Sequence, residues 1–238
     1  MKYTGILFIF LFSLSLNAQQ AERDVLQDIY QDVLHPSDAL LHGREYKVYF
    51  DPMHSKVLIP ENPNPTASVL IRNKMYQNVI LQYDTYKDLL VYQNLNIRIN
   101  NLITPVIINR NIIEEFTLQL PSGPARFRYL SFPEDQEGLL SSAFYEIVTE
   151  GVCQFIIDHS AFRKVEEGRV AYKYKTERYI INAGVITRIR GKKSLLKALT
   201  DEAAEVSAYL KRSNILVKRA DKEQIKDVVD HYLTLKHL

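Results

Sequence analysis

Apolar residues follow three different patterns along the chain, and each pattern predicts a different kind of element. Residues 5–16 form an almost unbroken apolar run, preceded by Lys2. From Tyr46 to about Ile189, apolar and polar residues mostly alternate, which is the two-residue period of half-buried strands. After Gly191, apolar residues recur every three or four positions, as on the buried face of a helix. The pattern therefore predicts a leader, a strand-rich region and a helical tail.

The leader has the layout of a secretory signal. It combines a short positive segment, an apolar stretch of about a dozen residues and a small residue, Ala18, before the expected cleavage point. A transmembrane helix needs roughly 18 to 20 apolar residues, so an uncleaved anchor is the second interpretation. We expect residues 1–18 to be removed. The mature chain is then exported to the periplasm, the cell surface or the medium and keeps no transmembrane segment.

The middle region predicts antiparallel strands joined by short turns. Predicted strand pairs are 79–83 with 89–92, 144–148 with 152–157, and 179–181 with 185–189, and residues 96–100 and 116–120 alternate as single strands. Between the second pair, Gly151 can supply the positive φ of a tight turn. Most connections are too short for crossover helices, so neighbouring strands should be antiparallel.

Helical spacing appears at both ends of the mature chain. Residues 23–34 carry a short amphipathic pattern that stops before Pro36, because the residue before a proline avoids the helical region. Near the C-terminus, Asp221 and Gln224 have the spacing of a capping box. The stripe that follows this box is Ile225, Val228, Val229, Tyr232 and Leu233. An earlier stripe with Val206 and Leu210 should pack against it.

These elements predict an α+β fold, mainly an antiparallel β-sheet in the form of a curved meander or half-barrel. A short N-terminal helix precedes the sheet and two to three C-terminal helices follow it. Residues 19–238 should form one β-rich domain, with a lead-in at 19–45, a β meander at 46–190 and a helical tail at 191–238. About 220 residues are ample for a core without disulfides.

Charge is distributed unevenly, although the net charge is only +2. Residues 1–162 have a balance of −6, residues 163–219 of +9 and residues 220–238 of −1. A basic block can attract an anionic partner, and it can equally complement the acidic half of the same chain. We expect the partner, if external, to be an anionic envelope component or a protein. Export argues against nucleic acid.

Basic residues in two places are candidates for contact with an anion or another ligand. One group interleaves with tyrosines and the other forms a turn before a predicted helix, where an anion could bind. The candidates are Arg169, Lys173, Lys175 and Arg178 in the first group, and Arg190, Lys192 and Lys193 in the second. The alternative is that Tyr172 and Tyr174 form a core face while the basic heads reach solvent. The turn is no phosphate-binding loop, because Ile186 stands where that motif requires glycine.

No catalytic, cofactor or metal signature is present in the sequence. The nucleophile elbow, the zinc-protease helix and the calcium loop are all missing. Asp227 and His231 share one helix face, but a metal site needs three or four ligands. Glu114 and Glu115 are neighbours on a strand and point to opposite faces. The lone Cys153 falls on the same face as Phe155 and Ile157, which predicts a buried, unpaired thiol.

These observations favour an exported, non-enzymatic envelope protein that acts by binding. The alternative is a periplasmic hydrolase or transferase whose site is assembled only in the fold. A cleft that gathers several of His54, Asp84, Glu115 and His159 would favour the enzyme. A broad groove without convergent titratable groups would favour the binding protein.

Short segments along most of the mature chain resemble those of a known group of proteins. The segments are GREYKVY at 43–49, ASVLI at 67–71, YQNVILQYD at 76–84, AFYEI at 143–147 with EG at 150–151, RYIIN at 178–182, KKSLL at 192–196 and EVSAYL at 205–210. Together they resemble a large group of uncharacterised exported proteins of the Bacteroidota. The resemblance implies a Gram-negative envelope setting and carries no activity, substrate or site residue.

Overall fold

The computed structural model describes residues 38–41, 43–51, 55–62, 65–95, 98–99, 102–132, 140–166 and 168–236. The chain divides into two compact units, residues 1–43 and residues 44–238. In the first unit, helix α2 (Asp38–Leu41) is described. The predicted signal peptide and the predicted helix over residues 23–34 lie outside the described residues.

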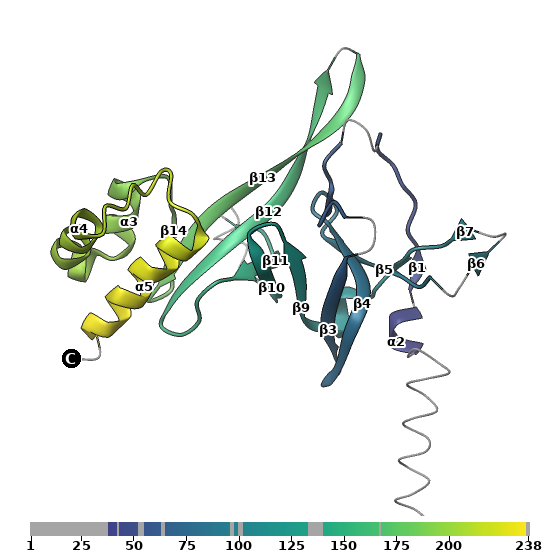
Figure 1. Ribbon diagram of the computed structural model, residues 1–238, viewed down its shortest axis with the longest axis horizontal. Coiled ribbons are helices and arrows are strands. Elements are labelled where there is room, and N and C mark those ends of the chain that lie inside the picture. The colour runs from purple at the N-terminus through teal and green to yellow at the C-terminus, as the bar shows by residue number, and fades with distance from the viewer. Residues whose placement is uncertain are drawn as a thin grey trace, which may run out of the picture. The chain divides into compact units, whose positions relative to one another are not determined.

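The second unit is built on one large antiparallel sheet (Figure 1). Its strands are β1 (Arg44–Glu45), β2 (Leu58–Ile59), β3 (Thr66–Ile71), β4 (Lys74–Asp84), β5 (Leu89–Gln93), β8 (Val106–Ile107), β9 (Ile113–Leu120), β10 (Gly123–Leu130), β11 (Ala143–Ile147), β12 (Cys153–Glu166), β13 (Arg169–Asn182) and β14 (Val185–Arg188). A separate two-stranded ladder consists of β6 (Arg98–Ile99) and β7 (Leu102–Ile103).

The order across the sheet is β1-β8-β5-β4-β3-β9-β10-β11-β12-β13-β14, with β2 paired to β4. Two meanders are therefore joined side by side, because β9 pairs with β3 and not with β8. In that junction Ala67 lies opposite Leu118 and Val69 opposite Phe116. A single turn of 3₁₀ helix, η1 (Arg110–Ile112), precedes β9. The predicted antiparallel sheet is confirmed. It also contains β1, β2, β3, β8 and β10, which were not among the predicted strands.

Aromatic side chains from four strands fill the concave side of this curved sheet. The ring of Tyr83 on β4 lies 5.5 Å from that of Phe127 on β10 and 6.2 Å from that of Phe144 on β11. Phe116 on β9 stacks on Phe127 at 4.9 Å. Since β3, β9 and β10 separate β4 from β11, these distances require strong curvature. The β4–β5 turn also reaches across the curve, where the N–H of Ala161 on β12 donates to the Thr85 carbonyl at 3.1 Å.

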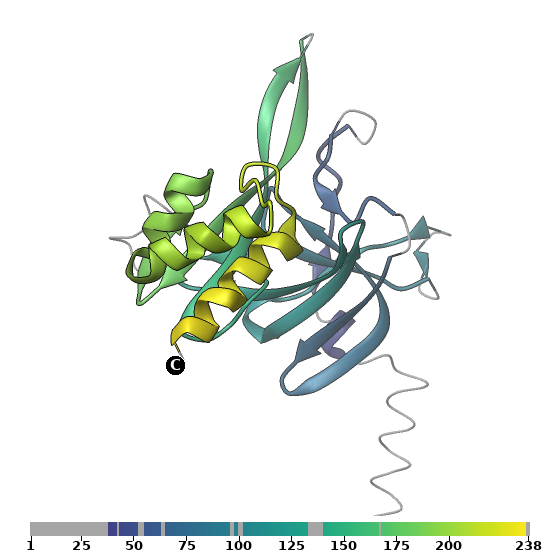
Figure 2. The same ribbon diagram turned by 60° about the vertical axis from the view of Figure 1, so that its left-hand side comes forward.

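Helices cover one face of the last three strands (Figure 2). They are α3 (Lys192–Ala198), the 3₁₀ turn η3 (Thr200–Glu202), α4 (Ala203–Arg212) and α5 (Lys222–Lys236). Their buried residues join strand residues in one core cluster: Cys153, Phe155, Ile157 and Ile180 with Leu195, Val206, Leu210, Ile225, Val228, Val229 and Tyr232. The predicted packing of the tail within its own chain is confirmed. Burying each large aliphatic side chain contributes about 1.5–3 kcal/mol.

The predicted capping box also forms at the start of α5. The N–H of Gln224 donates to Oδ1 of Asp221 at 2.8 Å, and the N–H of Asp221 donates to Oε1 of Gln224 at 3.1 Å. These bonds satisfy two amide groups that have no partner inside the helix. Among the described helices, none combines the length and the apolar character that crossing a bilayer would need.

Candidate functional site

A cavity of about 980 Å³ opens on the second unit where β12 and β13 meet the start of α5. We call it the β12–α5 cavity. Its walls come from six places: Glu146 on β11, Ile157 and His159 on β12, Tyr174, Thr176 and Arg178 on β13, residues 59–62 at the end of β2, residues 119–122 at the end of β9, and Lys218 with residues 220–222. A volume of this size suits a small-molecule ligand.

The two-residue period of the strands directs these side chains into the cavity. Tyr174, Thr176 and Arg178 are alternate residues of β13 and therefore share one face. On β12, His159 lies directly opposite Thr176. On β11, Glu146 lies opposite Ile157, which is the neighbour of His159 on that face. Strand register thus sets the part of the cavity wall that β11, β12 and β13 provide.

A continuous hydrogen-bonded chain of titratable groups runs through this wall. Nε2 of His159 lies 2.7 Å from Oε2 of Glu146, and Nδ1 of His159 lies 2.5 Å from the hydroxyl oxygen of Tyr174. The side chains of His159 and Glu146 are each 4% exposed. The ring of Phe127 covers the imidazole at 5.1 Å. All three hydrogen-bonded residues line the cavity, and the half-buried Tyr174 is the most exposed of them.

Lys222 completes this group from the first turn of α5. Its Nζ lies 2.8 Å from Oε1 of Glu146 and 3.3 Å from the carbonyl oxygen of Pro124. Burial by itself would raise the pKa of Glu146, but the hydrogen bond and charge of His159, followed by those of Lys222, outweigh it and lower the pKa. Glu146 is therefore a carboxylate at neutral pH.

The ionisation of Glu146 fixes the direction of the hydrogen bonds. A carboxylate only accepts, so Nε2 of His159 must carry the proton that it shares with Glu146. In the neutral imidazole Nδ1 is then an acceptor, and it receives the O–H of Tyr174. Burial, followed by the charges of Glu146 and Asp158, raises the pKa of Tyr174 well above its ordinary value. The phenol keeps its proton and is a poor nucleophile.

Two further cations border the cavity. The guanidinium of Arg178 donates to the carbonyl oxygens of Ala220 at 2.9 Å and Val217 at 3.1 Å, which fixes the segment before α5. The aliphatic stem of Lys218 lies against Gly191, where a Cβ would come within 3.3 Å of its Cγ. The absence of a side chain at Gly191 therefore leaves room for Lys218.

The structure separates the basic residues that were candidates for ligand contact into three groups. Arg178 borders the cavity. Arg169, Lys173 and Lys175 lie on the opposite face of β13, where Lys173 pairs with Glu166 at 2.9 Å and Lys175 with Glu177 at 3.3 Å. Arg190, Lys192 and Lys193 are exposed around the start of α3. The first two groups therefore cannot contact one small ligand together.

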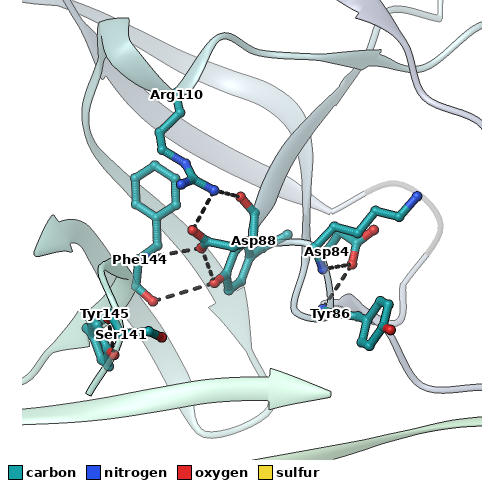
Figure 3. Close-up of polar contacts among 9 residues, drawn as sticks. Asp84, Tyr86, Asp88, Arg110, Ser141, Phe144 and Tyr145 are labelled. Carbon is teal, nitrogen blue, oxygen red and sulfur yellow. Dashed lines mark hydrogen bonds and ion pairs between the residues drawn. The ribbon is translucent and has the colours of Figure 1, made fainter. Parts of the chain in front are cut away.

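Asp84 holds a turn (Figure 3) and is not among the residues that line the cavity. It is fully buried at the end of β4 and accepts the hydroxyls of Tyr46 at 3.0 Å and Tyr49 at 2.6 Å. Its Oδ1 also accepts the N–H groups of Tyr86 and Lys87, each at 3.0 Å. Because both carboxylate oxygens have partners from the protein itself, the geometry is that of a structural residue.

Asp88 closes the other end of the same turn (Figure 3). Its carboxylate accepts the Tyr83 hydroxyl at 2.6 Å and the Phe144 N–H at 3.1 Å, and pairs with Arg110 at 2.7 Å. These bonds connect the β4–β5 turn to β11 and η1. They stabilise the curvature of the sheet, and they engage the Asp88 carboxylate in structural contacts.

The four residues that would have marked an enzyme are not gathered in one cleft. Of these, His159 lines the β12–α5 cavity, while Asp84 is buried in its turn. Glu115 lines a second cavity of about 680 Å³ and pairs with Arg128 at 2.9 Å. His54 lies outside the described residues. Glu146 and Tyr174 hydrogen-bond to His159, and Lys222 joins this group through Glu146. Of these three residues, only Tyr174 stood out in the sequence, as part of a basic and aromatic strand.

Within the described part of the chain, no three His, Cys, Asp or Glu residues are arranged to hold a metal ion. The ring of His231 stacks on that of Tyr209 at 4.2 Å. Cys153 is fully buried and unpaired, as its strand position predicted. Burial, and secondarily the charge of Asp201, raises the pKa of the Cys153 thiol to about 11. Such a thiol is unreactive.

Comparison of the chain with protein-family models, with curated proteins and with solved structures gives no match. The function must therefore be argued from the geometry of the site.

Proposed function

We propose that this protein is exported to the cell envelope and acts there by binding a small anionic ligand in the β12–α5 cavity, without catalysing a reaction. The observation that carries the proposal is the meeting of Lys218, Arg178 and Tyr174 at one cavity of about 980 Å³. Cations and a hydroxyl placed around a concave site are the groups that bind carboxylates, phosphates and sulfates.

The balance of charge around the cavity supports an anion. Glu146 is neutralised by Lys222, and Glu61 pairs with Lys56 at 3.1 Å. The carboxylate of Asp221 keeps its charge but faces the amide groups at the start of α5, which it caps. Among the described residues that line the cavity, Arg178 and Lys218 therefore remain as cations without a carboxylate partner. Arg178 donates to two carbonyl oxygens, which fix its position but leave its charge in place.

The state of the titratable groups supports binding rather than catalysis. Glu146 and His159 are almost fully buried and bond to each other, so each presents little surface at the cavity wall. Tyr174 is the most exposed of the three bonded residues at the cavity, and its raised pKa makes it a weak nucleophile. The hydrophobic core that buries Cys153 keeps its thiol away from solvent.

The second candidate function is a hydrolase or transferase, and one observation favours it. Glu146, His159 and Tyr174 are bonded in series, as in sites where a carboxylate orients a histidine that exchanges a proton with a hydroxyl. In such an enzyme Tyr174 would act as a proton donor to a leaving group.

The binding function is tested by titrating the mature chain, residues 19–238, with sulfate, phosphate and acetate in a calorimeter. Lys218→Gln removes a cation of the cavity and should weaken binding about fivefold, the order of one exposed charge contact. Lys197→Gln removes the same charge from an exposed site on α3 and should leave binding unchanged. Equal effects of the two variants, or no binding of any of the anions, would refute the proposal.

The choice between binding and catalysis is tested by recovering the ligand. Extracts of small anions incubated with the protein are analysed by mass spectrometry before and after the incubation. Unchanged ligand supports a binding protein. Conversion that stops in the Tyr174→Phe variant would establish the enzyme instead.

Export is tested separately, by N-terminal sequencing of the protein recovered from an expressing cell. The proposal expects the mature chain to begin near Gln19. If most molecules retained Met1, the protein would not be exported through cleavage of a signal peptide.

A further inference from the structure

We infer that the β12–α5 cavity binds its anionic ligand together with a proton, which is taken up by His159 and turns the Tyr174 hydroxyl into a donor toward the ligand. The inference rests on the proposed function, since it concerns how the same cavity holds an anion. It assigns the ligand to the oxyanions, because the new donor points at an acceptor oxygen.

The starting point is the state with a neutral imidazole. Nε2 of His159 donates to Glu146, and Nδ1 accepts the proton of Tyr174. The hydroxyl of Tyr174 has one proton, and in this state that proton is directed at His159. Toward the cavity, Tyr174 therefore offers only the lone pairs of its oxygen. An oxyanion placed there would face another acceptor and be repelled.

Protonation of His159 reverses the direction of the hydrogen bond between its Nδ1 and the Tyr174 hydroxyl. Both nitrogens of an imidazolium donate, so Nδ1 now donates to the Tyr174 oxygen at the same separation. The hydroxyl proton is released from His159 and can rotate about the C–O bond into the cavity. Tyr174 then becomes a donor next to Arg178 and Lys218, without any movement of the strands.

The charges around His159 favour the joint arrival of a proton and an anion. On β11 and α5 it faces the ion pair of Glu146 and Lys222, which is neutral as a whole. On β13 it faces Tyr174, with Arg178 farther along the strand, and on its own strand it is preceded by Asp158. From β10 it meets the uncharged ring of Phe127.

A protonated His159 adds one positive charge to a site that is almost fully buried. Its contact with Glu146 does not cancel this charge, because Lys222 shares the same carboxylate. A bound oxyanion would supply the missing negative charge next to Tyr174, the last residue of the hydrogen-bonded series. Proton and anion therefore stabilise each other, and by linkage each raises the affinity for the other.

The experiment uses sulfate as the probe, because sulfate keeps its charge over the whole range in which an imidazole titrates, from about pH 5 to about pH 8. Calorimetric titrations in two buffers of different ionisation enthalpy give the number of protons taken up. Above the midpoint of the His159 ring titration we expect uptake approaching one proton per sulfate. The affinity should fall roughly tenfold for each further pH unit.

A second readout follows the His159 ring by NMR. Saturating sulfate should move the midpoint of its titration to higher pH, and this shift should match the pH dependence of the affinity. Tyr174→Phe keeps the aromatic ring at position 174 and removes its hydroxyl donor. Sulfate binding at low pH should therefore weaken, and sulfate should shift the midpoint of the His159 titration less. The control is Tyr172→Phe, which removes a hydroxyl on the same strand that does not border the cavity.

The outcomes separate the two proposals. Sulfate binding that depends on Lys218 but involves no proton uptake and no shift of the His159 titration would overturn the inference and leave the binding function intact. Failure of sulfate to bind at any pH would overturn the anion-binding function itself. An equal loss in the Tyr174→Phe and Tyr172→Phe variants would overturn the role of the Tyr174 hydroxyl.

Discussion

The ammonium group of Lys222 lies 2.8 Å from Oε1 of Glu146, so the first residue of the last helix is ion-paired with a central strand of the sheet. The two residues are 76 positions apart in the chain. The pair joins the helical tail to the same carboxylate that orients His159. The cavity wall is therefore complete only when the tail is docked on the sheet.

Substitutions of Lys222 and Glu146 should have strongly non-additive effects on the free energy of unfolding. Lys222→Met leaves a buried carboxylate with one partner fewer and should lower the free energy of unfolding by roughly 3 kcal/mol. Glu146→Gln should cost a similar amount, because it leaves a buried ammonium group. The double variant should cost at least about 1 kcal/mol less than the sum of the two single variants, on the order of a typical contact coupling. Urea denaturation of the four proteins measures this.

An exposed ion pair of the same helix provides the control. Lys226 and Asp230 lie 2.6 Å apart, and the lysine side chain is 39% exposed. Lys226→Met should therefore change the stability by less than about 1 kcal/mol. Equal losses of unfolding free energy for Lys222→Met and Lys226→Met would show that the buried pair stabilises the fold no more than the exposed pair does.

Stability should fall in acid partly through Glu146. Its pKa is lower in the folded chain than in the unfolded chain, because His159 and Lys222 outweigh the effect of burial. A lowered pKa gives a contribution that is complete above the unfolded value and is lost as the pH falls through the folded value. Unfolding measured from neutral pH down to about pH 3 should therefore show a smaller acid loss for Glu146→Gln than for the natural chain.

Other carboxyl groups also contribute to the pH dependence of stability. Their contribution cancels when the curve of the variant is subtracted from that of the natural chain. The pKa of Asp158 is raised, mainly by burial, and it contributes with the opposite sign. Because the natural chain and the Glu146→Gln variant both contain Asp158, the difference between their curves reports Glu146 together with His159, to which it is bonded. Parallel curves would contradict the pairing.

Val229→Asp tests the burial of the tail. Val229 is fully buried among strand and helix residues, so an aspartate there would be an unpaired charge in the core. We expect a loss on the order of 4 kcal/mol in the free energy of unfolding. Thr234→Asp places the same charge at an exposed site of α5 and should cost about 0.5 kcal/mol or less. If Val229→Asp kept the melting temperature, the stripe would not be packed in the core.

Cys153 should resist thiol reagents in the native protein and react on unfolding. The side chain is fully buried, and burial raises the pKa of its thiol to about 11. As a positive control, Val152→Cys puts a thiol at a neighbouring position that is 72% exposed. Labelling with a chromogenic disulfide reagent should be rapid at position 152 and slow at position 153. Equal rates would mean that the register of β12 is wrong.

Much of the secondary structure could be predicted because it depends on local pattern. The capping box of Asp221 and Gln224 and the stripe through Val229 use only helical spacing, and both are confirmed. The predicted hairpins correspond to β4 with β5, β11 with β12, and β13 with β14. Strand β10 was missed although Ala125 and Phe127 alternate with Arg126 and Arg128, since Pro124 at its start weakened the signal.

The site was harder to predict because its members come from distant segments. One clue was present: Glu146 is a charged residue inside the apolar run of β11, and such a charge needs buried partners. The sequence could not name them. His159 and Tyr174 lie on one face by strand period, but the pairing of β12 with β11 and β13 decides which residues stand opposite Glu146.

Residue period and the cost of exposing apolar surface were enough to predict the strand-rich and helical regions, the burial of Cys153 and the packing of the last helix within its own chain. The pairing of β9 with β3, the curvature of the sheet around Tyr83 and Phe116, and the contact of Lys222 with Glu146 are visible only in the folded chain. Strand order and ion pairs between distant segments depend on which surfaces meet in space. Local hydrophobic patterns do not specify those long-range contacts.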